Sequence, residues 1–546
     1  MSIVDPILPD ERIKAMRDSK DWQDKTLLEY FDEAVVKHGN KPAVIGYRKE
    51  NNEKQSKTYA ELLALSDRLA AGLLHKGVCK GDVVSFQLPN WWEFVVVYLA
   101  CMRVGAVSNP LMPIFRESEL SYMLGFAESK VIFAPETFRG YDHKSMIEQL
   151  GVSLPCLEHV CILAEDGLDP FMKEEVSLED RALFEQSTLL PNDVFLLMYT
   201  SGTTGAPKGV MHTPNTHDYC ARKFIERIQL TENEHVFMGS PTAHMTGLMY
   251  GISVPMMLST TTVLLDQWEP QTAWEIIRDE KIAFTMGATP FLADLSASDA
   301  LEACNHDTFR VFVCGGAPVP PAIGRRAAKR LNVNLITVWG MTEMSAVTTT
   351  LLTDSEEKVF ETDGFPYSGT EVRVVDREGN TLGENKEGRL QTRGAGNFVG
   401  YLKRPEAYDT DPDGWFETGD LAKIIHQKYI RITGRSKDII IRGGENIPVA
   451  LVENTLYKNP LLEDIAIVAK PDERLGERAC CFVTLQKGAE INIQQIKDYL
   501  SDEGLSKNYW PEYVETLSAM PRTASGKIQK FKLRQMAEKL QIKDTI

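Results

Sequence analysis

A loop rich in glycine and hydroxyl side chains is the strongest chemical signal in this sequence. Residues 200–208 read Thr-Ser-Gly-Thr-Thr-Gly-Ala-Pro-Lys and follow a hydrophobic strand candidate at 196–199. Such a loop exposes backbone N–H groups and hydroxyls, and Lys208 adds a positive charge, so it has the components of a phosphate-binding loop. It is not a Walker A loop, because Pro207 stands where that pattern requires glycine. The alternative is a polar turn that binds nothing.

Five further segments contain residue types that suit a nucleotide site. The Glu343 carboxylate could hold Mg²⁺, and the Trp339 ring could stack on a base. Asp420 could accept hydrogen bonds from both hydroxyls of a ribose, and Lys527 could supply a mobile cation from a loop that contains Gly and Ser. Each segment alone is also compatible with an ordinary loop. The segments are 315–318, 338–343, 417–420, 434–446 and 521–527.

Several other patterns give no support for a different chemistry. Residues 394–400 miss the GxGxxG spacing by one residue and are interpreted as turns. The chain contains neither GxSxG nor HExxH, so hydrolase and zinc-protease interpretations lack support. His244 stands alone, and a lone histidine is more often structural than catalytic. Cys156, His159 and Cys161 have no second ligand pair at zinc spacing, so they do not favour a metal site.

Composition narrows the class of protein. The 546 residues carry a net charge of −17, and 43% are apolar and 25% charged, which is typical of globular proteins. An acidic chain is a poor general binder of nucleic acid or anionic membranes. Nine scattered cysteines without CxxC favour a reducing compartment, and no segment has the features of a signal peptide or a membrane span. We therefore expect a cytoplasmic protein with no nucleic-acid partner and no transmembrane segment.

Strand and helix patterns alternate along the first two thirds of the chain. Thr58 and Glu61 have capping-box spacing at the start of a helix that runs to His75. The alternation predicts βαβ units and two largely parallel sheets. Further helices are expected at 91–103 and 116–127, and strands at 82–88, 130–134, 262–265, 283–286 and 311–314.

The pattern changes twice towards the C-terminus. Short alternating strands at 371–375 and 389–392 predict an antiparallel, β-barrel-like unit. Helix patterns at 449–457 and 492–500 and strand patterns at 464–469 and 479–485 then predict a small α+β domain. We therefore expect an α/β fold with a large N-terminal domain of two mixed or parallel sheets flanked by helices, plus the β unit, and a small mobile C-terminal domain. The expected limits are 1–434 for the large domain, with subdomains at about 1–188, 189–364 and 365–434, then 435–437 for a hinge and 438–546 for the small domain.

In this order, the segments resemble the motifs of the adenylate-forming superfamily of acyl-CoA synthetases, luciferases and peptide-synthetase adenylation domains. The resemblance covers roughly residues 25–535. It implies that ATP and a carboxylic acid form an acyl-adenylate and pyrophosphate, and that a thiol, usually coenzyme A, then displaces AMP. It also implies Mg²⁺ as a cofactor, a small-molecule acid as the substrate, and a homodimer as one option for the assembly.

The resemblance also implies roles for individual residues. The 200–208 loop would hold the β- and γ-phosphates, and the adenine would lie between residues 315–318 and Trp339, where the family more often has Tyr. Lys527 would bridge the carboxylate and the α-phosphate as charge develops. The implied catalytic residues are His244, Thr342, Glu343 and Lys527, and the implied Mg²⁺ ligands are Glu343 and Thr200. The implied nucleotide- and coenzyme-binding residues are Thr200, Ser201, Gly202, Thr203, Thr204, Gly205, Lys208, Gly315, Gly316, Ala317, Pro318, Trp339, Gly340, Met341, Thr342, Asp420, Arg435, Lys437 and Gly444.

The acyl pocket is expected between residues 244–250, 286–290 and 315–341. Amino-acid-activating relatives usually have Asp where this chain has Met245, which argues against an amino-acid substrate. The segment 243–247, with Gly247 leaving room, is similar to bacterial short- and medium-chain fatty acyl-CoA and cyclohexanecarboxylate-CoA ligases. A medium-chain or alicyclic acid is therefore favoured, with an aryl acid second. The expected lining residues are Met245, Thr246, Gly247, Met249, Met286 and Met341.

Two alternatives to an acyl-CoA ligase remain open. One is an adenylation enzyme that loads a carrier protein, which is expected to act in trans because no carrier-like segment follows residue 535. The other is a monooxygenase or a non-catalytic binder with an adenylate-forming fold. AMP release that depends on a thiol separates an acyl-CoA ligase from an enzyme that loads a carrier protein, and oxygen consumption tests the monooxygenase alternative.

Lys437→Pro tests the expected hinge. A hinge residue changes φ and ψ by large amounts, whereas proline fixes φ near about −65°. We expect the variant to form acyl-adenylate normally and to lose transfer to coenzyme A, as measured by single-turnover kinetics of each half-reaction. If Lys437 is instead a surface charge in a rigid linker, both half-reactions and the melting temperature will change together or not at all.

Overall fold

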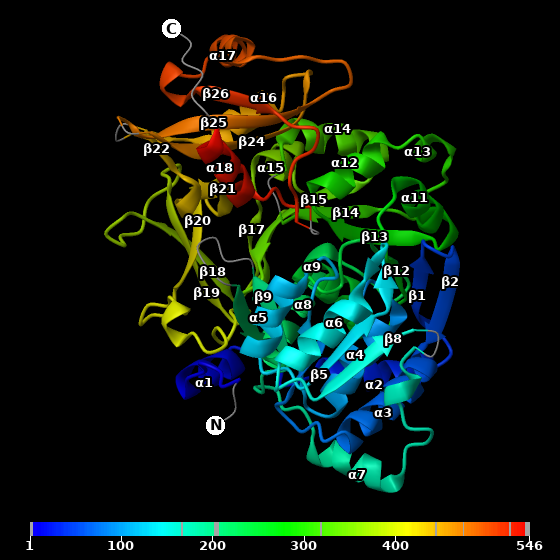
Figure 1. The fold of residues 1–546 in the computed structure, drawn as a ribbon. Coiled ribbons are helices and arrows are strands. Elements are labelled where there is room, and N and C mark those ends of the chain that lie inside the picture. The colour runs from blue at the N-terminus through cyan, green and yellow to red at the C-terminus, as the bar shows by residue number, and fades with distance from the viewer. Residues whose placement is uncertain are drawn as a thin grey trace.

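The protein is built from sheets that bring distant parts of the chain together, as Figure 1 shows. The computed structural model describes residues 4–164, 167–200, 207–316, 319–442, 445–472, 474–523 and 526–540. Within these residues, four sheets have four or more strands each. None of the described helices is both long and apolar enough to cross a membrane.

The first sheet has six strands in the order β10-β9-β4-β3-β5-β8. Its members are β3 (Val83–Phe86), β4 (Val107–Pro110), β5 (Val131–Pro135), β8 (His159–Leu163), β9 (Leu196–Thr200) and β10 (Lys208–His212). All neighbours pair in parallel except β9 and β10, which form an antiparallel edge. The segment that carries the predicted phosphate loop therefore lies at one edge of this sheet.

The second sheet has nine strands in the order β17-β16-β15-β14-β13-β11-β12-β1-β2. Its members are β1 (Pro42–Arg48), β2 (Glu53–Thr58), β11 (His235–Met238), β12 (Thr262–Leu265), β13 (Ile282–Gly287), β14 (Val311–Gly315), β15 (Asn334–Met341), β16 (Ser345–Thr349) and β17 (Phe365–Pro366). Six neighbouring strands pair in parallel, in the order β15-β14-β13-β11-β12-β1. Strand β1 comes before the expected subdomain boundary at 188/189 but belongs to the second sheet. Strands β9 and β10 come after that boundary but belong to the first sheet, so neither sheet is confined to one expected subdomain.

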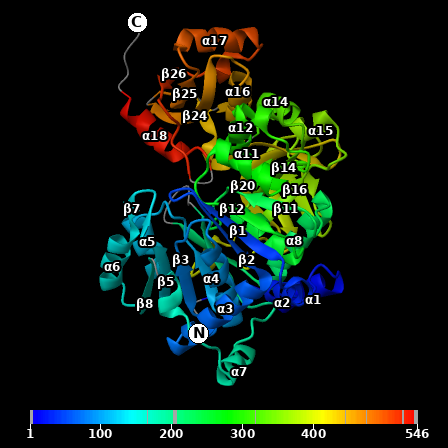
Figure 2. The same cartoon turned by 90° about the vertical axis from the view of Figure 1, so that its right-hand side faces the viewer.

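Helices cover and separate these sheets (Figure 2). The predicted capping box at Thr58 and Glu61 is present, and α3 (Tyr59–His75) ends where the sequence indicates. Helix α4 (Trp92–Arg103) is buried almost all round and contacts strands of both sheets, which explains the apolar run at 94–102. The other helices of this region are α1 (Asp10–Asp18), α2 (Leu27–His38), α5 (Glu117–Phe126), α6 (His143–Ser153), α7 (Leu178–Gln186), α8 (Pro214–Ile228), α9 (Met245–Leu248), α10 (Val254–Met257), α11 (Pro270–Asp279), α12 (Thr289–Ala297), α13 (Ala300–Ala303), α14 (Pro321–Leu331) and α15 (Glu356–Glu361).

The third sheet is the predicted antiparallel unit. It has the order β18-β19-β20-β21, with β18 (Thr370–Val375), β19 (Gly388–Gly394), β20 (Phe416–Ile425) and β21 (Tyr429–Arg435). A short 3₁₀ turn, Ser436–Asp438, follows β21, and the chain then enters the fourth sheet. The chain thus changes sheets at the segment for which the sequence predicts a hinge.

The fourth sheet and its helices form the C-terminal α+β part of the fold, which lies at one end of the molecule in Figures 1 and 2. Its elements are β22 (Ile440–Arg442), β23 (Glu445–Ile447), β24 (Leu462–Asp472), β25 (Gly476–Leu485), β26 (Tyr513–Thr516), α16 (Val449–Leu456), α17 (Ile493–Asp502) and α18 (Lys530–Lys539). The buried Lys470 donates to the carbonyl oxygens of Ala537 and Leu540 at 2.8 and 3.0 Å. This contact satisfies carbonyls at the end of α18, the helix that follows the Lys527 loop.

Candidate functional site

The predicted phosphate loop connects β9 and β10. Thr200 and Lys208 are partners in the antiparallel register, so they form the base of the loop. The Thr200 hydroxyl donates to the Lys208 carbonyl oxygen at 3.5 Å, and the Lys208 ammonium lies 4.0 Å from the centre of the Tyr401 ring. The predicted phosphate ligands Ser201, Gly202, Thr203, Thr204 and Gly205 lie outside the described residues.

The turn between β15 and β16 holds Thr342 and Glu343. A Cβ at Gly340 would lie 2.0 Å from the Ser345 carbonyl oxygen, so only glycine allows this tight hairpin. Glu343 is 5% exposed, and its carboxylate accepts a hydrogen bond from the Tyr401 hydroxyl at 2.7 Å. The turn is thus fixed so that a buried carboxylate lies beside the tyrosine ring that also contacts Lys208.

Trp339, Asp420 and Arg435 form a connected group. The Trp339 indole N–H donates to Asp420 Oδ2 at 2.9 Å, and Arg435 Nε lies 2.9 Å from Asp420 Oδ1. Asp420 and Arg435 are also cross-strand partners in β20 and β21. A carboxylate has about four lone-pair directions, so Asp420 can still accept ribose hydroxyls while it orients both neighbours. Its hydrogen bond with Trp339 is an additional contact that the sequence does not indicate.

Lys527 meets the large domain in a small cavity beside His244. Gly316 lies beside the lysine stem, since a Cβ there would make an ordinary contact of 3.6 Å with Lys527 Cε, and its φ of +79° is a conformation that favours glycine. Burial and the positive charge of Arg435 lower the pKa of Lys527 to about 8, although Asp420 and Glu343 oppose this shift. The cavity is lined by Ser240, His244, Thr246, Ala288, Gly315, Gly316 and Lys527.

His244 is a neutral hydrogen-bonding group rather than a proton carrier at neutral pH. It is the N-cap of α9, and its Nδ1 accepts from the Thr246 backbone N–H at 3.3 Å. Burial, with a smaller effect of Lys527, lowers its pKa to about 3. Because Nδ1 accepts a hydrogen bond, Nε2 carries the ring proton and can donate.

The structure alters the interpretation of the predicted acyl pocket. A Cβ at Gly247 would lie 2.1 Å from the Pro241 carbonyl oxygen, so this glycine allows close backbone packing and does not leave room for a ligand. Met245, Met249 and Met286 are at most 6% exposed and belong to the main hydrophobic core, whereas Thr246 lines the cavity. Only a rearrangement of core side chains would let these methionines reach an acyl chain.

Some predicted site residues are not tested by this geometry. Ala317, Pro318 and Gly444 lie outside the described residues. Lys437 lies in the short turn after β21. Met341 ends β15, next to Thr342. Their proposed ligand contacts stay predictions.

Two contributors to the site were missed from the sequence. Tyr401 contacts both Lys208 and Glu343, and His212 Nε2 lies 2.8 Å from the Thr342 carbonyl oxygen. Neither residue belongs to a segment whose composition suggested chemistry, although His212 lies only four residues after Lys208. Only the folded arrangement brings them to the site.

The sequence matches the family model of the AMP-binding enzyme over residues 31–402 and that of the AMP-binding enzyme C-terminal domain over residues 451–527. The chain therefore belongs to the AMP-binding enzyme family. Together with the relatives and solved structures that resemble the chain, this match confirms the predicted class, an AMP-forming ligase of the acyl-CoA synthetase type, and its α/β fold with a large N-terminal and a small C-terminal part.

Individual proteins show similarity along nearly the whole chain. The chain is 35% identical to the medium-chain fatty-acid–CoA ligase of Escherichia coli, with 96% of this chain and 93% of that protein covered. It is 30% identical to the vibriobactin-specific 2,3-dihydroxybenzoate-AMP ligase of Vibrio cholerae, with 95% of each covered. The crystal structure of ATP-bound MatB from Rhodopseudomonas palustris has a TM-score of 0.81 and 26% identity, over 94% of this chain and 99% of that one.

The lowered pKa of Lys527 predicts how adenylation depends on pH. The lysine is cationic below about pH 8 and loses its charge above it, so kcat/KM for pyrophosphate release should fall as the pH rises through this value. His244, with a pKa of about 3, should contribute no change near neutral pH. In Lys527→Arg the remaining activity should lack this decline, because arginine stays charged. An unchanged decline in that variant would contradict the assignment.

Proposed function

We propose that this enzyme activates a carboxylic acid as an acyl-adenylate and transfers the acyl group to coenzyme A. The observation that carries the proposal is the position of Lys527. The C-terminal part of the fold places this cation beside His244 and the glycines at the end of β14, close enough to Asp420 and Glu343 for their charges to affect it. A buried cation between a nucleotide site and a small cavity suits a reaction in which two anions, the carboxylate of the acid and the α-phosphate of ATP, must approach each other.

In the first half-reaction, a carboxylate oxygen of the acid attacks the α-phosphorus of ATP, and the bond from that phosphorus to the pyrophosphate oxygen breaks. Negative charge builds on the α-phosphate oxygens, where the Lys527 ammonium and the Thr342 hydroxyl would stabilise it. Neutral His244 would donate from Nε2 to an oxygen of the acid or phosphate. No side chain has to form a covalent bond, so catalysis consists of positioning and charge stabilisation.

In the second half-reaction, the thiol sulfur attacks the acyl carbon, AMP leaves, and the thiol proton passes to solvent. The expected hinge at 435–437 lies between the third and fourth sheets. Rotation there would remove Lys527 from the cavity and bring the segment near Gly444 to the thiol.

The residues around Glu343 fit a Mg²⁺ ion. Mg²⁺ is usually bound by one or two carboxylates together with substrate phosphates and waters. The buried Glu343 supplies one such carboxylate, held in place by Tyr401, and the Thr200 hydroxyl lies at the base of the phosphate loop. Bound there, the ion would neutralise charge on the phosphates. Among the described residues, no three or more His, Cys, Asp or Glu side chains cluster as metal ligands.

We propose a medium-chain fatty acid or an alicyclic acid as the substrate. Support comes from the medium-chain fatty-acid–CoA ligase relative. Met245 stands where amino-acid-activating relatives usually have Asp, so this position offers no carboxylate to pair with a substrate ammonium. Lys527 and His244 are the ionisable residues that line the cavity, and neither would pair with a second cationic group on the acid. An aryl acid is the second candidate, because the Vibrio cholerae relative is named for 2,3-dihydroxybenzoate.

Pyrophosphate release over a panel of acids, with and without coenzyme A, tests the function. The panel runs from acetate to palmitate and includes cyclohexanecarboxylate, benzoate and free amino acids. We expect the highest kcat/KM for octanoate or cyclohexanecarboxylate, and AMP release that depends on coenzyme A. Burying an unpaired ammonium costs several kcal/mol, so amino acids should be poor substrates. A free amino acid as the best substrate would exclude the proposed acid class.

Thr246 offers a matched pair of variants for the same panel. Thr246→Val keeps the shape of the side chain and should leave octanoate activation within about threefold, because it removes only a hydroxyl from the cavity wall. Thr246→Asp adds a negative charge beside the acid and should lower kcat/KM by more than about tenfold. Equal effects of both variants would show that Thr246 does not face the acid.

A further inference from the structure

His212 joins the two segments that would hold the triphosphate and the α-phosphate. It is the last residue of β10, four residues after Lys208, and it is 1% exposed. Its Nε2 lies 2.8 Å from the carbonyl oxygen of Thr342, 130 residues further along the chain. A single side chain thus connects a strand of the first sheet with the turn that follows β15 of the second sheet.

The hydrogen bond between His212 and the Thr342 carbonyl oxygen can have only one donor. A carbonyl oxygen can only accept, so His212 Nε2 must carry a proton and donate. Nδ1 lies 3.3 Å from the Thr216 hydroxyl, and burial lowers the pKa of the ring to about 4, so the imidazole is neutral near pH 7. The bond is therefore a neutral N–H to carbonyl bond that does not change over the working pH range.

The other contacts of the turn show why this bond matters. The Glu343 carboxylate and carbonyl are held by the Tyr401 hydroxyl and the Phe398 N–H, both from the segment after β19. The hydrogen bond from His212 ties the turn directly to β10, the strand that follows the phosphate loop. Without it, the turn and β10 would still be joined through residues 398–402, whose backbone hydrogen bonds reach both, but Thr342 itself would lose its direct hydrogen bond to β10.

We propose that His212 is a positioning residue for adenylation, which holds Thr342 at a fixed distance from Lys208 so that one ATP can contact both. This inference rests on the proposed function. A misplacement of a catalytic group by even about 1 Å can cost on the order of 10²-fold in rate. The loss should be largest in the step that uses the triphosphate and small in thioester formation from supplied acyl-adenylate, which has no β- or γ-phosphate.

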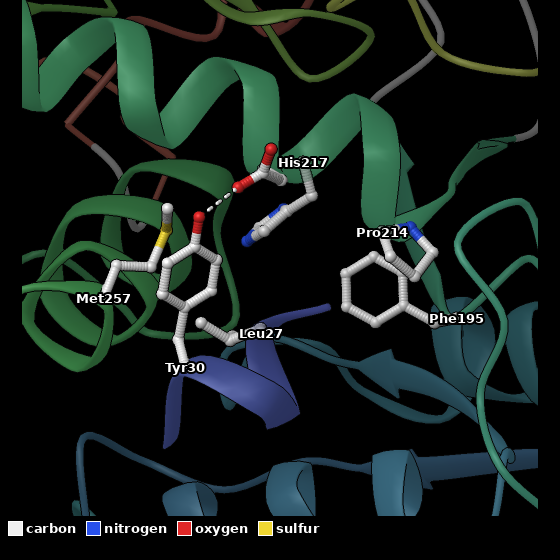
Figure 3. Close-up of a pocket in the computed structure, with 7 residues that line it drawn as sticks. Leu27, Tyr30, Phe195, Pro214, His217 and Met257 are labelled. Carbon is white, nitrogen blue, oxygen red and sulfur yellow. Dashed lines mark hydrogen bonds between the residues drawn. The ribbon is translucent and has the colours of Figure 1, made fainter. Parts of the chain in front are cut away.

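His217 provides a control for burial and chemistry. It lies five residues after His212, is 2% exposed, and its Nε2 contacts the Ser253 hydroxyl at 2.8 Å. Figure 3 shows it pointing into a different small cavity, among Leu27, Tyr30, Phe195, Pro214 and Met257. Burial lowers its pKa to about 3, so it is also a neutral, buried histidine. No predicted site residue lines this cavity.

The decisive comparison is His212→Gln with His212→Asn. Both side chains carry an amide donor, but the Gln amide nitrogen occupies a position like histidine Nε2, whereas the Asn amide is one methylene too short to reach Thr342. We measure KM for ATP, kcat of pyrophosphate release, thioester formation from supplied octanoyl-adenylate, and the melting temperature. His217→Gln and His217→Asn receive the same measurements.

For His212→Asn we expect kcat/KM for ATP to fall about 10–100-fold, as for loss of one buried hydrogen bond with its orientation. Thioester formation should change less than about threefold, and His212→Gln should recover most of the lost activity. His217→Gln and His217→Asn should lower the melting temperature without a selective loss of kcat/KM for ATP. The inference is overturned if Gln and Asn at 212 behave alike, if both half-reactions fall equally, or if the His217 pair gives the same pattern. If the wild type releases no pyrophosphate with any acid, the proposed function itself fails.

Discussion

The buried ammonium of Lys527 is the charge on which the arrangement of the site depends. Removing an ammonium from water is costly unless nearby groups compensate it. Here Asp420 and Glu343 favour the charged form, while burial and Arg435 oppose it, and the result is a lysine poised near pH 8. A lysine in this balance changes its charge readily near pH 8, so the charge of the site depends on the groups around Lys527.

The C-terminal part of the fold holds this lysine through short-range contacts. Thr523 and Lys527 exchange two hydrogen bonds, from the Thr523 N–H to the Lys527 carbonyl at 2.7 Å and from the Lys527 N–H to the Thr523 hydroxyl at 3.0 Å. Arg522 donates to the Gly526 carbonyl and to the Asp464 carboxylate on β24. The loop is thus attached to its own sheet, so under the proposed rotation Lys527 would move together with the C-terminal part of the fold.

Local patterns in the sequence were sufficient for the class of fold, whereas the roles of the nucleotide residues are implied by the family resemblance and stay predictions. The capping box at Thr58, the apolar α4 and the antiparallel strands near 371 and 389 are local features, and the structure confirms them. The pairing of β1 with β12 could not be predicted, because it depends on which strand edges meet after more than 200 residues of intervening chain.

Contacts between residues far apart in the sequence also could not be predicted within the site. Trp339 and Asp420 were each identified from their neighbours, but their mutual hydrogen bond joins residues from different sheets. Gly247 was misinterpreted because a missing side chain can serve either a ligand or a neighbouring backbone, and only the position of the Pro241 carbonyl decides between them. His212 had no local signal, since its role depends entirely on Thr342 being opposite to it.

The most direct test of this account is the effect of Lys527→Ala on each half-reaction separately. Loss of one preorganised charge contact in a water-excluded site lowers the rate by about 10²–10³-fold. The account predicts at least that loss in acyl-adenylate formation, measured by single-turnover pyrophosphate release with octanoate. It predicts nearly unchanged thioester formation from supplied octanoyl-adenylate and coenzyme A, because Lys527 would then be outside the cavity. An equal loss in both half-reactions would contradict the claim that Lys527 serves adenylation alone.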